Sequence, residues 1–75
     1  MKQLYCETFS LKEIMDFIEE AMDQYHHNHR DRYEMTMDMG KAIAYAEAAW
    51  AMNNITEDDA HMLIELAENL IKTLQ

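Results

Sequence analysis

The fold is decided by residues 56–74, which read TEDDAHMLIELAENLIKTL. Thr56 is a favoured N-cap residue, and the three acids that follow it complement the positive end of a helix dipole. Beyond these acids, apolar residues recur every three or four positions, which is the period of an amphipathic helix. They are Ala60, Leu63, Ile64, Ala67, Leu70, Ile71 and Leu74. The spacing predicts a helix over residues 57–74.

A helix is also expected near residues 10–29. Ser10 and Glu13 have the spacing of a capping box, in which each side chain accepts a hydrogen bond from the other residue's backbone amide. Apolar residues follow at helical spacing, and acids occupy the opposite face. These acids are Glu13, Asp16, Glu20 and Asp23. The last turn is rich in histidine, whose positive charge would complement the helix dipole.

The segment near residues 32–52 forms the third expected helix. Asp31 and Glu34 make a second capping box, and Asn53-Asn54 can adopt the left-handed conformation that ends a helix. One side of this helix is apolar. The other side carries small residues, namely Gly40, Ala44, Ala48 and Ala51. A helix that is apolar or small on both sides is usually buried on more than one side.

Together these segments predict an all-α fold, a small up-down-up three-helix bundle. One Gly and no Pro among 75 residues leave few tight turns, which argues against an all-β fold. The chain is expected to be one helical domain (1–75) with a short N-terminal arm (1–9), and to self-associate because its core is small. The expected core includes Ile18, Ile43, Ala46, Trp50, Leu63 and Ala67.

The charge balance is strongly acidic. Asp and Glu number 15 and Lys and Arg number 6, giving a formal net charge of −9. Such a surface repels phosphate backbones and anionic membranes, so direct nucleic-acid or membrane binding is not expected, and a basic protein is the natural partner. With Cys6 as the sole cysteine, no signal peptide and no apolar run long enough for a membrane span, we expect a cytoplasmic protein.

The sequence contains no recognisable catalytic motif. One Gly cannot build a phosphate-binding loop, and a bundle this small is not expected to hold a substrate cavity of ~300 Å³ or more. We expect no enzyme and no cofactor. Asp23/His26 and Asp58/His61 are carboxylate-x-x-His pairs of the kind that hold metals in helical bundles. An up-down-up bundle puts them at opposite ends, which leaves a surface site at His26 and His29 as the weak metal candidate.

Three functions remain open. The first is a non-enzymatic protein-interaction module, such as an adaptor or regulatory bundle, that forms a homodimer or docks on a larger protein. Its predicted contact residues are Phe17, Met37, Gly40, Ala44, Ala48, Ala51, Met62 and Leu66. The alternative is a phage or mobile-element inhibitor whose acidic face mimics nucleic acid toward a basic partner. The third is a metal-binding bundle. The composition is typical of small acidic helical proteins of bacteria and phages, but no motif carries a family resemblance.

Overall fold

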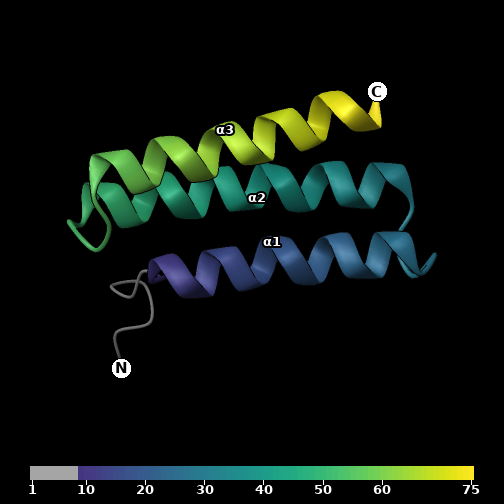
Figure 1. Cartoon of the computed structure of the whole chain (residues 1–75), viewed down its shortest axis with the longest axis horizontal. Coiled ribbons are helices and arrows are strands. Elements are labelled where there is room, and N and C mark those ends of the chain that lie inside the picture. Colours follow the sequence, from purple (N-terminus) through teal and green to yellow (C-terminus); the bar gives the residue numbers. More distant parts are fainter. Residues whose placement is uncertain (1–8) are drawn as a thin grey trace.

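The computed structural model describes residues 9–75 and contains three helices, α1 (Leu11–His26), α2 (Arg32–Ala51) and α3 (Glu57–Leu74). They run up, down and up, with α2 between the other two (Figure 1). The described residues form no strand. The all-α three-helix bundle predicted from the sequence is therefore confirmed. The expected N-terminal arm and Cys6 lie outside the described residues, apart from Phe9.

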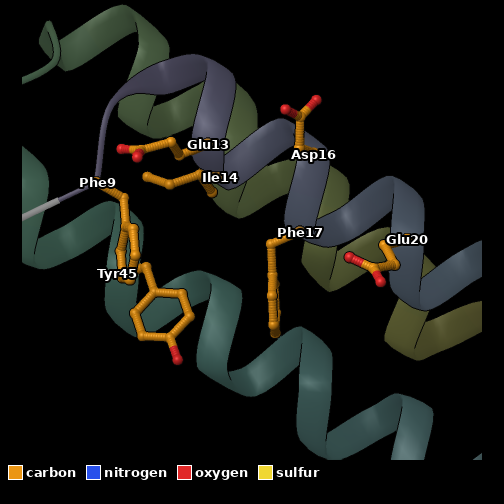
Figure 2. A pocket seen from close by; sticks show the side chains of 7 residues that line it. All are labelled: Phe9, Glu13, Ile14, Asp16, Phe17, Glu20 and Tyr45. Atoms are coloured by element: carbon orange, nitrogen blue, oxygen red, sulfur yellow. The ribbon is translucent and has the colours of Figure 1, made fainter.

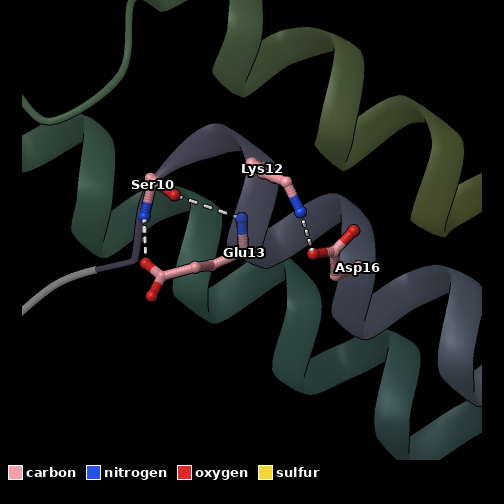
Figure 3. A network of polar contacts seen from close by, with 4 residues as sticks. All are labelled: Ser10, Lys12, Glu13 and Asp16. Atoms are coloured by element: carbon pink, nitrogen blue, oxygen red, sulfur yellow. Dashed lines mark hydrogen bonds and ion pairs between the residues drawn. The ribbon is translucent and has the colours of Figure 1, made fainter.

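Each helix begins at the cap that the sequence predicts. The Ser10 hydroxyl accepts from the Glu13 backbone N–H at 3.1 Å, and the Glu13 carboxylate accepts from the Ser10 N–H at 2.8 Å (Figure 3). Asp31 and Glu34 form the same reciprocal pair at 2.8 and 3.0 Å. Thr56 accepts from the third amide of α3 at 3.0 Å. These contacts satisfy amides that a helix leaves unpaired at its start.

Asparagine ends both of the first two helices. Asn28 and Asn53 have φ angles of 64° and 62°, the left-handed conformation that stops a helix. After α1, the His29 N–H donates to the carbonyl of Gln24 at 2.8 Å, which closes the turn around Asn28. The left-handed conformation predicted in Asn53-Asn54 is confirmed. α1 ends at His26, three residues before the expected end near residue 29, because Asn28 adopts the left-handed conformation.

The core between the helices consists of Ala, Ile, Leu and Met side chains. α2 packs most extensively on α3, α1 lies along the other flank of α2, and α1 and α3 touch only slightly. Ile18, Ala46, Leu63 and Ala67 are buried as expected, whereas Ile43 is half-buried against the core. The buried residues of α2 are Met35, Asp38, Met39, Ala42, Ala46 and Ala49.

Trp50 does not lie in the core, so that prediction is wrong. It is 38% exposed and meets the ring of His61 edge-on, with centroids 5.5 Å apart. The buried line of α2 runs through Ala46 and Ala49, which leaves Trp50 at its edge. A helical repeat assigns a residue to a side of the helix, but it does not fix how far the buried stripe extends around it.

Asp38 is the buried charged residue among residues 9–75, at 6% exposure. The Nε of Arg30 lies 3.1 Å from its carboxylate and also donates to the side-chain carbonyl of Gln24 at 3.0 Å. Arg30 therefore ties α1 and the connection between the helices to α2. At the same end of the bundle, Arg32 donates to the carbonyl of Leu74 at 3.0 Å.

Candidate protein-interaction surfaces

The side of α2 that points away from the core is exposed and carries a strip of small and apolar residues, with the charged side chains of Lys41 and Glu47 beside it. Tyr33 and Met37 are 72% and 48% exposed there. We define the outer face of α2 as Tyr33, Met37, Gly40, Ala44, Ala48 and Ala51, all of which are exposed and lie three or four positions apart. Apart from Gly40, its two chain neighbours and the adjacent backbone of α2, no described atom lies within 4 Å of the position that a Cβ on Gly40 would occupy. Packing within the described chain therefore does not require glycine at this position.

The exposed sides of the other two helices are charged instead. On α1, all four residues of the predicted acidic face are exposed, namely Glu13, Asp16, Glu20 and Asp23. On α3, the exposed acids include Glu57, Asp58, Glu65 and Glu68. Lys12 forms an ion pair of 2.8 Å with Asp16 (Figure 3), and this hydrogen bond and charge raise the pKa of Lys12 above its usual value. The outer face of α2 thus differs in character from its neighbours.

The remaining predicted contact residues lie elsewhere. Met62 is 45% exposed on α3. Phe17 and Leu66 are half-buried and pack against the core. Of the eight predicted contact residues, only Met37 and the four small residues therefore share the outer face of α2.

A hollow of about 290 Å³ opens to solvent along the seam between α1 and α2 (Figure 2). We call it the seam hollow; its lining residues are Phe9, Glu13, Ile14, Asp16, Phe17, Glu20 and Tyr45. The Tyr45 ring lies 4.6 Å from that of Phe9 and 5.4 Å from that of Phe17, between centroids, with tilted and edge-on geometry. The three rings make a continuous aromatic wall.

Sequence reasoning did not bring these rings together. The pattern pairs Phe9 with Ile14 across the first cap and sets Phe17 and Tyr45 beside their stripes. Their meeting depends on how α1 sits against α2, which periodicity within one helix does not fix. Asn54 strengthens the arrangement, because its side-chain amide donates to the carbonyl of Phe9 at 3.3 Å.

Three carboxylates line the seam hollow, and they differ in what they contact. Glu13 extends toward Phe9, Asp16 points away from the hollow, and Glu20 stands beyond Phe17 (Figure 2). Glu13 caps α1 and Asp16 pairs with Lys12. Glu20 has no hydrogen-bond or ion-pair partner among residues 9–75. No cationic side chain lines the hollow within that range.

Two further hollows lie near Arg30. One of about 150 Å³ adjoins the seam hollow at Phe17 and Glu20 and reaches Arg30 and Asp38. The other, of about 400 Å³, has a lining of cations, acids and two uncharged residues, namely Arg30, Lys41, Asp31, Glu34, Asp38, Tyr33 and Met37. The expectation that a bundle this small holds no cavity of ~300 Å³ or more is therefore wrong, because this hollow has a larger volume. This larger hollow is open to solvent beside the α1–α2 connection and is not enclosed in the core.

The histidines among residues 9–75 do not form a metal site with neighbouring acidic side chains. Among residues 9–75, no group of three or more His, Cys, Asp and Glu side chains could hold a metal ion. His26 lies against Tyr25, with ring centroids 5.8 Å apart, and His29 lies 6.4 Å from His27. α1 and α3 run in the same direction (Figure 1). The two carboxylate–histidine pairs therefore lie at opposite ends of the bundle, Asp23 with His26 at the end of α1 and Asp58 with His61 at the start of α3.

No helix within residues 9–75 combines the length and the apolar character needed to cross a bilayer. Comparison of the chain with protein-family models, curated proteins and solved structures gives no match in any of the three.

Proposed function

We propose that the chain is a small, non-enzymatic protein-interaction module and that the outer face of α2 is its contact surface. The observation that supports this most is the contrast between helices. α1 and α3 cover their exposed sides with acids, whereas the outer face of α2 presents small and apolar side chains to solvent. An exposed apolar surface rimmed by charge is typical of a protein contact site.

The partner that fits this face best is a second copy of the chain. Positions 33, 37, 40, 44, 48 and 51 are spaced four, three, four, four and three residues apart, so they line one side of the helix. Small residues let two helix backbones approach closely, and a two-fold axis brings the same face of each copy together. Gly40 costs a helix about 1 kcal/mol relative to Ala, which a close contact would offset. The net charge of −9 opposes association but is screened over ~8 Å at physiological salt.

Cysteine cross-linking tests whether α2 meets its mate. Met37, Gly40, Ala44 and Ala48 are replaced by Cys one at a time, in a background in which Cys6 is Ser. A disulfide needs Cα atoms within about 7 Å, so only positions near the two-fold axis should oxidise rapidly to a covalent dimer. Asn69→Cys, exposed on α3, is the matched control. Equal, slow oxidation at all five positions would contradict the proposal.

The acidic face of α1 supports a second candidate, an inhibitor that occupies the basic groove of a nucleic-acid-binding protein. Glu13, Asp16, Glu20 and Asp23 are all exposed along one helix of a chain with net charge −9. Binding of this kind weakens steeply as salt rises. Binding to a basic protein whose affinity does not change with salt concentration would contradict the inhibitor function.

A further inference from the structure

We propose that the seam hollow binds the side chain of an arginine presented by a basic protein partner. This site is distinct from the outer face of α2, and it rests on the proposed function in that it requires a protein partner. The combination of an aromatic wall, an unpartnered carboxylate and a strongly acidic chain carries the proposal.

The aromatic wall offers faces on which a planar cation can stack. Phe17 and Tyr45 come from facing helices, and Phe9, 42% exposed, extends the wall toward the start of α1 (Figure 2). A guanidinium within about 6 Å of an aromatic ring centroid is attracted by the ring's quadrupole. Arginine stacks on such rings more readily than lysine, because its charge is spread over a plane and is weakly hydrated.

The carboxylates supply the complementary charge. Glu20 has no partner among residues 9–75, so its oxygens are available to the fork of N–H donors on a guanidinium. Glu13, whose other role is to cap α1, adds a second negative charge at the opposite end of the hollow. The nearby cations are already engaged, Lys12 with Asp16 and Arg30 with Asp38. Arg30 shares the adjoining hollow of about 150 Å³ with Glu20, but its polar contacts are with Asp38 and Gln24 and not with Glu20.

The dimensions select one side chain over a larger ligand. At about 290 Å³, the seam hollow is at the lower limit of the ~300–1,000 Å³ typical of sites that enclose a small molecule, and it is open to solvent. A phosphate-bearing ligand would meet the carboxylates of Glu13 and Glu20, and no cationic side chain among residues 9–75 lines the hollow. A single side chain that projects from a partner's surface can enter the hollow while the partner's backbone stays outside it.

Nuclear magnetic resonance titration of the full chain, labelled with ¹⁵N, tests the site. The probe is a synthetic peptide of alternating glycine and arginine, compared with peptides in which every arginine is lysine or the neutral isostere citrulline. We expect saturable shifts centred on Phe17, Glu20 and Tyr45 with the arginine peptide, about threefold weaker binding of the lysine peptide, and no saturation with citrulline.

A matched pair of variants locates the charge contact. Glu20→Gln should weaken the arginine peptide about threefold to tenfold, while Glu19→Gln, the same change at an exposed neighbour outside the hollow, should leave binding within about 1.5-fold. Equal losses in both variants, or shifts spread evenly over the acids of α1 and α3, overturn the proposal. Concentration-dependent shifts at the hollow without peptide would identify a second copy as its occupant and overturn it too.

Sedimentation equilibrium separates this site from the proposed function. Glu20→Gln should have the same oligomeric state as the parent chain, because Glu20 lies on α1 and outside the outer face of α2. A chain that is monomeric yet binds the arginine peptide at the hollow would overturn the dimer and leave this site standing. A chain that is dimeric but gives no saturable shifts at the hollow with the arginine peptide would overturn the arginine site and leave the dimer standing.

Discussion

Arg30 and Asp38 form an ion pair across the junction between α1 and α2, with Nε 3.1 Å from Oδ2. Asp38 is 6% exposed, and the same Nε donates to Gln24 at 3.0 Å. The pair and Gln24 join α1, the connection and α2. A buried carboxylate depends on such partners, because its loss of hydration is otherwise uncompensated.

Removal of the guanidinium should therefore destabilise the bundle. We expect Arg30→Met to lower the free energy of unfolding by about 1–3 kcal/mol, since it leaves Asp38 buried without its cation. Urea unfolding followed by circular dichroism measures the loss. Lys41→Met, which removes an exposed cation from α2, is the control and should change stability by less than about 0.5 kcal/mol. Similar midpoints for the two variants would contradict the role given to Arg30.

Trp50 should contribute less than its size suggests. Since the indole is 38% exposed and rests edge-on against His61, we expect Trp50→Ala to cost about 1–2 kcal/mol, below the ~3–5 kcal/mol of a buried Trp. Met39→Ala, at a position that is 0% exposed, should cost about 2–5 kcal/mol. Thermal melting of both variants by circular dichroism makes the comparison, and a larger loss at Trp50 would place the indole in the core after all.

Two threonines, Thr56 at the N-cap of α3 and Thr73 in its last turn, form a matched pair for mutation. Thr56 accepts from the amide of Asp59, whereas the hydroxyl of Thr73 bonds back to the carbonyl of Asn69 inside the helix. Thr56→Ala should cost about 0.5–2 kcal/mol, and Thr73→Ala should be close to neutral, because a bond within the helix adds little. Denaturant midpoints compare the two. Equal effects would show that the Thr56 hydroxyl does not stabilise the helix start.

Asn53 ends α2 in the left-handed conformation, with φ of 62°. Asn53→Ala should destabilise by about 1 kcal/mol, because a Cβ without a local hydrogen-bonding group is disfavoured there, while Asn53→Gly should be tolerated. Asn69→Ala, on the exposed side of α3, is the control and should be neutral or slightly stabilising. A neutral Asn53→Ala would remove the argument that this asparagine sets the end of α2.

The three helices and their starts could be predicted from the sequence because each rests on local chemistry. Ser10 with Glu13, Asp31 with Glu34, and Thr56 act within one turn, and the capping geometry follows from residue type and spacing. The end of α1 lies three residues before the expected position, because the three histidines around Asn28 are compatible with a helix whereas Asn28 itself adopts the left-handed conformation.

The contacts between helices could not be predicted in the same way. Asp38 falls on a buried stripe, and its partner Arg30 reaches it from an irregular connection. Phe9, Phe17 and Tyr45 each lie beside a stripe, and only the placement of α1 against α2 brings them to one hollow. Periodicity identifies the side of a helix that is buried, but the angle between two helices decides which flanking residues meet.

Sedimentation equilibrium at micromolar concentration tests the central claim, that the outer face of α2 joins two copies. The parent chain should show twice its mass of 8.9 kDa, and Ala48→Glu should shift it toward the monomer, because it buries a like charge at the two-fold contact. Asn69→Glu adds the same charge on the exposed side of α3 and should leave the dimer intact. A parent chain that sediments at 8.9 kDa throughout, or equal dissociation of the two variants, would contradict the claim.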